Sequence, residues 1–243
     1  QPEPAERQAI EDLYDDSLRH VDRILSEIHQ ELEDTGMLQD TLWILVSDHG
    51  EAFSQHGLWQ HARTVHEEMV RVPLVVVVPE DQRQRFPSGR RSTPVGLADL
   101  VPTLIELFDL PGAEPWSSAS LVDLLEGEDI PGEGRPPIVT RTAGPAEHVA
   151  IRSGDLKLIH RLTGFGDDGK RKGPGTWELY DLSTDPYEQR RLPHKDPAHL
   201  EDFQRLRREL KLFREGARER ARAAAEVELD AETEQHLEDI GYL

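Results

Sequence analysis

The sequence predicts an α/β fold, with a mostly parallel mixed sheet flanked by helices, followed by a small antiparallel β-plus-helix subdomain. In the first part, a long segment with helical periodicity leads into short segments that are apolar on both faces, as strands inside a parallel sheet are. The pattern then changes to short alternating segments separated by turns, and finally to a charged amphipathic segment. We therefore predict two units, residues 1–135 and residues 136–243.

The first unit begins with a predicted long helix. Apolar residues recur at spacings of three and four over residues 5–33, and Gly36 supplies the left-handed conformation that commonly ends a helix. Residues 41–46 (TLWILV) and 73–78 (PLVVVV) are apolar on both faces, which indicates central strands. Residues 95–112 predict a short strand followed by a helix, because a proline inside this segment suits a first helical turn.

The second unit contains three segments of alternating polarity with turn signals between them, at residues 137–142, 148–161 and 176–182. Residues 196–225 carry charges around an apolar stripe and predict a helix. Residues 164–175, rich in glycine and lysine, predict a hairpin tip. Its cations at positions 170–172 either face solvent or meet an anionic polymer.

Composition excludes several classes of function. The net charge of −20 repels nucleic acid and anionic membranes, so neither is an expected partner. The absence of cysteine excludes disulfides, thiolate metal sites and a cysteine nucleophile within this chain. No apolar stretch approaches the roughly 20 residues of a membrane helix, and the residues given contain no signal peptide. The chain starts with Gln1, so periplasmic, secreted and cytoplasmic locations all stay open, as does the oligomeric state.

Asp48 and His49 directly follow the predicted strand 41–46. Ligands of open α/β sheets gather at the carboxyl ends of strands, where loops can turn neighbouring side chains toward one point. A carboxylate oxygen and an imidazole nitrogen together suit Ca²⁺, Mg²⁺, Mn²⁺ or Zn²⁺. The alternative is a simple turn, in which Asp48 caps the chain and Gly50 supplies a positive φ.

Two further histidines, His56 and His61, lie within the same short segment and favour a functional site over packing. An imidazolium near neutral pH can protonate a leaving-group oxygen or bind an anionic oxygen, so both are candidate catalytic residues. His66 could instead be a surface residue on a following helix.

The ordered set of motifs resembles the C-terminal portion of the sulfatase family, within the alkaline phosphatase superfamily. The motifs are Ser-Asp-His-Gly-Glu, the "HG…HxRT…EE…RVPL" run, "LADLVPTLIELFDLPG", "WELYDLSTDPYEQRRL" and the ending "HLEDIGYL". The similarity covers nearly the whole chain in order, and it implies an alkaline phosphatase-like fold and hydrolysis of sulfate esters.

The resemblance also implies roles for individual residues. Asp48 and His49 match the paired metal ligands of the family, which implies one divalent cation, with Ca²⁺ as the expected ion and Mg²⁺, Mn²⁺ or Zn²⁺ as alternatives. His61 matches a position that contacts the transferred group or the leaving-group oxygen, and His56 lies close enough to contribute.

The nucleophile of the family is a formylglycine formed from the Cys or Ser of a Cys/Ser-x-Pro-x-Arg motif, which this chain lacks. We therefore expect this chain to supply part of an active site and to be inactive alone. We also expect it to fold poorly alone, because an apolar strand edge would be open.

Two other functions stay open. A phosphoric mono- or diester or phosphonate hydrolase of the same superfamily is the nearest rival, because histidine at the second ligand position is common there too. The other is a non-catalytic binding module that retains the fold.

Overall fold

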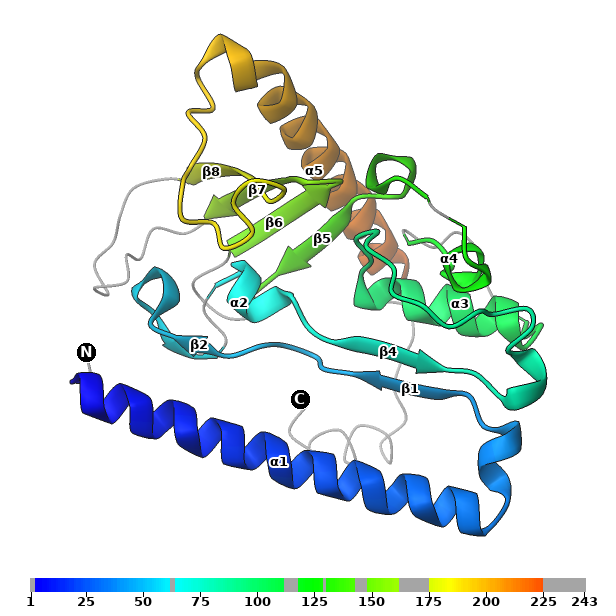
Figure 1. Ribbon diagram of the computed structural model, residues 1–243. Coiled ribbons are helices and arrows are strands. Elements are labelled where there is room, and N and C mark those ends of the chain that lie inside the picture. The colour runs from blue at the N-terminus through cyan, green and yellow to red at the C-terminus, as the bar shows by residue number, and fades with distance from the viewer. Residues whose placement is uncertain are drawn as a thin grey trace.

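The computed structural model of the chain describes residues 3–61, 64–111, 118–128, 130–142, 148–161 and 175–224. A long N-terminal helix runs along one side, a two-stranded ribbon lies beside it, and a four-stranded sheet backed by a second long helix lies beyond (Figure 1). The helices of the first half are α1 (Pro4–Asp34), α2 (Glu67–Val70), α3 (Leu100–Leu107) and α4 (Val122–Glu126), and its short 3-10 turns are Met37–Asp40, Gln55–Gly57, Glu80–Gln82, Leu97–Asp99 and Gly132–Gly134.

Helix α1 confirms the predicted helix at residues 5–33. It starts with a proline in its first turn, and Gly36 has a φ of 72° just beyond its end, as the sequence predicted. Edge-to-face contact between Tyr14 and Phe53, with ring centroids 5.0 Å apart, joins the helix to the loop after the first strand. Most of its apolar stripe stays exposed, including Leu13 and Val21 at 67% and 50%.

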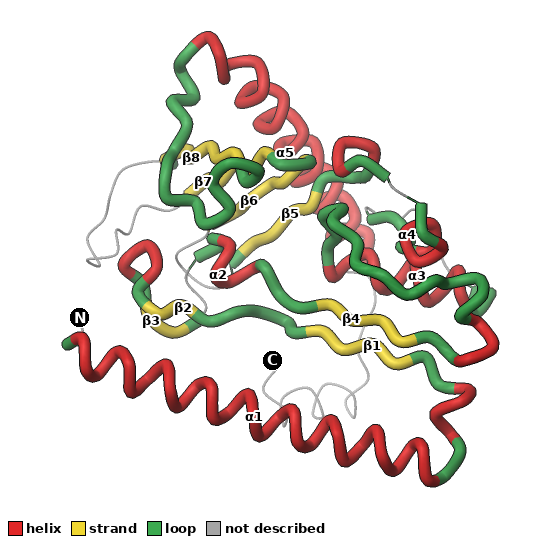
Figure 2. Tube along the Cα trace, in the orientation of Figure 1, coloured by secondary structure: helices red, strands yellow, loops and turns green. Residues whose placement is uncertain are grey.

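Strands β1 (Trp43–Val46) and β4 (Leu74–Val77) confirm the two predicted strands, but the described strands around them do not form the mostly parallel sheet that was expected. Among the described strands they pair only with each other, antiparallel, with Trp43 opposite Val77. A parallel pair needs a crossover of a dozen or more residues, usually a helix, that returns the chain to the same end. The segment between β1 and β4 is instead mostly loop (Figure 2), so the chain folds back on itself.

In the range predicted as a short strand and a helix, the described residues 95–111 contain the 3-10 turn Leu97–Asp99 and helix α3, and no strand. The carboxylate of Asp99 accepts a hydrogen bond from the backbone N–H of Gly96, with 2.9 Å between Oδ2 and N. This capping bond turns the chain into a helix immediately, which leaves no room for a strand.

The second half forms an antiparallel sheet in the order β5-β6-β7-β8, backed by helix α5 (Pro197–Ala224). The strands are β5 (Ile138–Arg141), β6 (His148–Ser153), β7 (Leu156–Arg161) and β8 (Thr176–Asp181). They confirm the alternating segments, and α5 confirms the helix predicted at residues 196–225. The hairpin tip before Gly175 and the ending HLEDIGYL lie outside the described residues.

The largest core lies between this sheet and α5. Its fully or nearly buried members are Val149, Ile151, Leu158, Leu179, Phe203, Leu206 and Leu210. A second cluster on the opposite face includes Val65, Ile159 and Tyr180, and it attaches the loop before α2 to the sheet. Within the part of the chain that the structure describes, no helix has the length and apolar character needed to cross a membrane.

Candidate active site

An open cavity of about 880 Å³ lies where the two halves of the chain meet. Asp48, His49 and His61 line it from the loop after β1, and Lys157 lines it from the four-stranded sheet. The structure therefore brings three of the four predicted site residues to one cavity.

Asp48 and His49 are arranged so that one nitrogen of the imidazole faces the carboxylate. The Nδ1–H of His49 donates to the carbonyl oxygen of Gly50 at 2.8 Å, so Nε2 carries the free lone pair. This Nε2 lies 4.0 Å from Oδ2 of Asp48. The other carboxylate oxygen, Oδ1, accepts the backbone N–H of His49 at 2.9 Å, as in the capped turn considered as the alternative.

The donor set fits a divalent cation. Zn²⁺ lies about 2.1 Å from imidazole nitrogens and carboxylate oxygens, and Ca²⁺ lies about 2.3–2.6 Å from its oxygen ligands. Two donor atoms 4.0 Å apart can therefore share one such ion. The hydrogen bond from His49 to Gly50 is the backbone contact that usually fixes the tautomer of a metal-binding histidine. The carboxylate of Asp48 is 88% exposed, which leaves it free to bind an ion.

The turn that carries Asp48 and His49 is fixed by its backbone. Gly50 donates its N–H to the carbonyl oxygen of Met69 at 2.8 Å. A Cβ atom at position 50 would overlap the carbonyl oxygen of Glu68, so only glycine fits this close approach of two chain segments. The hydroxyl of Ser47 donates to the carbonyl oxygen of His49 at 2.7 Å and closes the turn.

His61 lies beside His49 on the same cavity. Their rings stack with centroids 5.2 Å apart and planes inclined by 24°. Nδ1 of His61 is 3.5 Å from Oε2 of Glu51, and the side chain of His61 is 59% exposed. The imidazole is therefore oriented by a carboxylate on one side and accessible to a ligand on the other.

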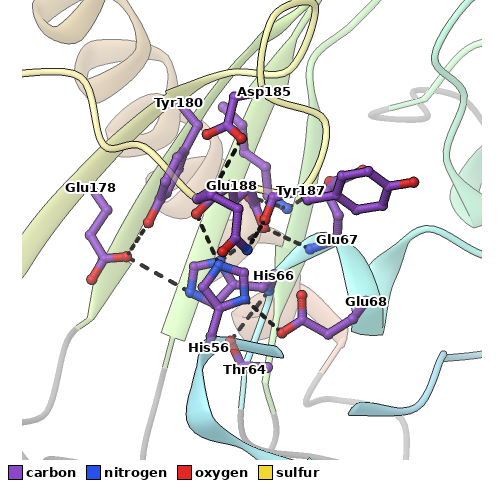
Figure 3. Close-up of polar contacts among 12 residues, drawn as sticks. His56, Thr64, His66, Glu67, Glu68, Glu178, Tyr180, Asp185, Tyr187 and Glu188 are labelled. Atoms are coloured by element: carbon purple, nitrogen blue, oxygen red, sulfur yellow. Dashed lines mark hydrogen bonds and ion pairs between the residues drawn. The ribbon is translucent and has the colours of Figure 1, made fainter. Parts of the chain in front are cut away.

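His56 is placed differently and does not line this cavity. Its Nδ1 lies 2.9 Å from the carboxylate of Glu68, and its Nε2 donates to the carbonyl oxygen of Glu188, also at 2.9 Å (Figure 3). Because neither partner oxygen can donate a proton, an imidazolium satisfies both contacts. The hydrogen bond to Glu68 raises the pKa of His56 above its usual value, although burial opposes the change.

His66 is buried, so the interpretation of it as a surface residue was wrong. Its ring stacks on that of His56 with centroids 3.8 Å apart, and only 1% of the residue is exposed. Nδ1 of His66 lies 2.8 Å from Oε2 of Glu188, which also accepts the backbone N–H of Glu67 at 2.7 Å. The stacked imidazoles of His56 and His66 thus both contact Glu188 in the second half of the chain.

Donor atoms of His56, His66 and Glu188 lie within 4.8 Å of one another, a spacing that a metal ion could bridge. The two rings are parallel within 4°, however, so their in-plane lone pairs cannot converge on one ion. The donor atoms are also hydrogen-bonded to protein groups. We therefore interpret this group as a structural hydrogen-bond network.

Lys157 completes that network from strand β7. Its Nζ lies 2.7 Å from Oε1 of Glu67 and 2.9 Å from Oε1 of Glu188, and all three residues are buried. Burial alone would raise the pKa of Glu188, but the hydrogen bond from His66 and the charge of Lys157 outweigh it and lower the pKa to about 2. Buried charges are tolerated here because each has a partner.

Sequence reasoning missed Lys157 and Glu188. Lys157 sits at a position of an alternating strand that the pattern assigns to the outer face, and only the loop packed over that face buries it. Glu188 adopts a left-handed φ of 54° within the turn "DPYEQRRL". A left-handed residue that is neither Gly, Asn nor Asp is a signal of strain at a functional or binding contact, but it is visible only in the structure.

Residues 2–110 match the sulfatase family model. The chain is similar to sulfatases over most of its length. The N-acetylglucosamine-6-O-sulfatase of Bacteroides thetaiotaomicron is 29% identical over 181 residues, which are 69% of this chain and 29% of that protein. The choline-sulfatase of Rhizobium meliloti is 29% identical over 202 residues, which are 79% of this chain and 35% of that protein.

Among solved structures, BT4656 in complex with its substrate D-glucosamine-2-N,6-O-disulfate matches with a TM-score of 0.66 at 25% identity, over 82% of this chain and 39% of that chain. The likeness confirms the predicted α/β, alkaline phosphatase-like fold class. The chain spans about a third of the length of the curated sulfatases it matches. The sulfatase match includes Asp48, His49 and His61.

Proposed function

We propose that this chain supplies part of the active site of a metal-dependent hydrolase of sulfate esters. The observation that carries the proposal is the convergence of Asp48, His49 and His61 on one cavity, with a carboxylate oxygen and an imidazole nitrogen 4.0 Å apart. Support comes from the similarity to sulfatases over most of the chain.

Asp48 and His49 hold the divalent cation in this proposal, through Oδ2 and Nε2. When bound, such a cation, with Ca²⁺ as the expected ion, neutralises charge on the ester oxygens and increases the acidity of the attacking group. The hydrogen bond from His49 to Gly50 and the closed turn around Gly50 keep the two ligand atoms in place before the ion binds.

His61 acts on the substrate. Its exposed ring faces the cavity, where it can donate a proton or a hydrogen bond to an oxygen of the ester or of the leaving group. Glu51 orients the ring from behind. His56 acts through the loop instead, because its contacts to Glu68 and Glu188 hold the segment between Asp48 and His61 against the second half.

The nucleophile in this proposal is a formylglycine that does not come from this chain, which has no cysteine and no Ser-x-Pro-x-Arg sequence. We assign residues 1–135 to the catalytic α/β domain and residues 136–243 to a C-terminal subdomain that closes the cavity from the other side. Arg152 and Lys157 of that subdomain line the cavity. Arg152 is partly exposed and supplies positive charge for an anionic substrate, whereas Lys157 is buried between Glu67 and Glu188.

The test compares Asp48→Asn and His61→Gln in the protein at its full natural length, with p-nitrophenyl sulfate and p-nitrophenyl phosphate as substrates. We expect each variant to lose about 100-fold or more in kcat on the sulfate ester, since one electrostatic or acid–base group typically contributes that much. Matched controls are Asp81→Asn and His20→Gln, which change exposed residues outside the cavity.

Turnover of both variants at the rate of the controls would contradict the proposal. Faster turnover of the phosphate ester by the unmodified protein would favour the phosphoric ester hydrolase instead. The 243-residue chain assayed alone with Ca²⁺ should show no turnover.

A further inference from the structure

A second cavity, of about 580 Å³, lies between helix α5 and the sheet, next to the facing residues His160 of β7 and Trp177 of β8. Five basic side chains of α5 line it: Arg207, Arg208, Lys211, Arg214 and Arg218. Glu215 is the one acidic residue among its described lining residues. We call this cavity the basic groove. It is locally positive on a chain whose net charge is −20.

The cations of the groove are stacked along one side of the helix. Arg207, Lys211, Arg214 and Arg218 follow one another at spacings of four, three and four residues, which places them on a single helical face. Like charges at these spacings repel one another and destabilise a helix. The span from the first to the last is about 16 Å at 1.5 Å per residue, long enough to face several charges of a ligand.

The same helix pairs its charges elsewhere. Arg205, which does not line the groove, lies 3.2 Å from Asp202 and 3.4 Å from Glu209. Within the groove, the ion pair that the described residues provide is a long one, 3.7 Å between Lys211 and Glu215, both largely exposed. Helix α5 therefore pairs Arg205 with two carboxylates, whereas among the described residues the five cations that line the groove face a single acidic residue.

The wall of the groove is built from stacked rings. His160 lies on Trp177 with centroids 3.7 Å apart and planes within 2°, and the guanidinium of Arg207 lies 5.7 Å from the centre of the Trp177 ring. Nδ1 of His160 is buried and has no hydrogen-bond partner among the described residues. Burial, and then the charges of Arg214 and Arg207, lower the pKa of His160 to about 4, so the ring is neutral at physiological pH.

We propose that the basic groove binds a sulfated oligosaccharide. The row of cations on α5 matches a ligand that carries several sulfate groups along its length. A long nucleic acid is disfavoured because the rest of the molecule repels an extended polyanion. The sulfated class of ligand rests on the proposed function; the anionic character of the ligand rests on the groove alone.

Binding of a fluorescently labelled heparin hexasaccharide to the protein at its full natural length tests the proposal, by anisotropy at low and at physiological salt. The variant Lys211→Gln/Arg214→Gln/Arg218→Gln removes three cations of the groove and keeps good helix formers. We expect it to weaken binding about tenfold or more and to reduce the salt dependence, because fewer counterions are displaced.

The matched control is Arg23→Gln/Arg83→Gln/Arg90→Gln, which removes the same charge from exposed sites outside the groove. It should bind within twofold of the unmodified protein. Circular dichroism melting of all three proteins checks that they are folded; if the triple groove variant unfolds, Arg218→Gln alone, compared with Arg90→Gln, replaces it.

Three outcomes would overturn the proposal: no binding of the hexasaccharide, equal weakening by the control variant, or equally tight binding of an unsulfated hexasaccharide or of an oligonucleotide with the same number of charges. The assay involves no turnover. If the hexasaccharide binds but Asp48→Asn and His61→Gln turn over p-nitrophenyl sulfate like their controls, the proposed function fails and the groove does not. If those variants lose activity but the hexasaccharide does not bind, the groove fails and the proposed function does not.

Discussion

Lys157 illustrates how single residues join the two halves of this chain. Its ammonium group lies between the buried carboxylates of Glu67, from the first half, and Glu188, from the second. Removing one member of such a buried set typically costs about 3–5 kcal/mol, because the remaining charge is left without a partner. The loop that carries the candidate catalytic residues is therefore tied to the sheet by charge as well as by apolar packing.

His56 makes the stability of this junction depend on pH. Its pKa is raised in the folded protein by Glu68, with Glu188 and the stacked His66 also facing the ring. The contribution is fully present below the unfolded value of 6.5 and is lost as pH rises through the folded pKa. We expect His56→Gln to flatten the decline in the free energy of unfolding above pH 6.5, measured by urea denaturation.

The exposed His20 on α1 provides the control for that measurement, and His20→Gln should leave the pH profile as it is in the unmodified protein. An identical slope above pH 6.5 in His56→Gln and the unmodified protein would show that the imidazolium contact is not formed.

At the residue scale, contacts between residues close together in the sequence could be predicted, and contacts between distant residues could not. Asp48, His49 and His61 lie within one loop after one strand, so their convergence could be predicted. Glu188 contacts His66 across 122 positions, and Lys157 contacts Glu67 across 90. No local pattern encodes such distant contacts, which depend on how the loop packs on the sheet.

At the scale of elements, the loop between β1 and β4 is shaped by unusual backbone conformations. Ser54, His56 and Gln60 all have positive φ values, of 75°, 50° and 67°. Such residues are strained unless their surroundings hold them, and they concentrate at functional sites. The short strands β2 (Ala52–Phe53) and β3 (Trp59–Gln60) pair within this loop and help to hold it between the candidate metal ligands and His61.

The apolar face of helix α5 packs on the four-stranded sheet. Leu206 is fully buried against the sheet, whereas Leu212 on the same helix is 67% exposed. We expect Leu206→Ala to lower the free energy of unfolding by about 2–5 kcal/mol, the cost of a cavity in a packed core. Leu212→Ala should change it by about 0.5 kcal/mol or less.

Urea denaturation of the two variants in the protein at its full natural length gives the comparison. Equal effects of the two substitutions would contradict the packing of α5 on this sheet. The substitutions are chemically identical and lie on one helix, so helix propensity cannot account for a difference.

Helices and strands were predicted with good bounds where periodicity was strong, as in α1 and the sheet of the second half. The direction of pairing between β1 and β4 was not predicted. A sequence that is apolar on both faces of a strand indicates that the strand is buried, but it does not indicate which strand lies next to it. The short strand expected before α3 does not form, because Asp99 accepts a capping hydrogen bond from the backbone N–H of Gly96. The hydrophobic pattern of the sequence does not indicate such a local hydrogen bond.

At the scale of the whole molecule, two regions differ from the acidic average. The cavity at the junction gathers Asp48, His49 and His61 with Lys157 and is the candidate active site. The basic groove on α5 is a separate surface with the opposite sign to the net charge. The exposed apolar residues of α1 and of β4, with Val75 48% exposed, fit the expectation that this chain folds poorly alone, which stays a prediction.

The position of a bound cation tests the proposed function most directly. Crystals of the protein at its full natural length, grown with Mn²⁺ in place of Ca²⁺, would show the ion in an anomalous difference map. We predict a peak within about 2.5 Å of both Asp48 Oδ2 and His49 Nε2. A map with no peak there, and with both side chains bonded only to their own turn, would contradict it.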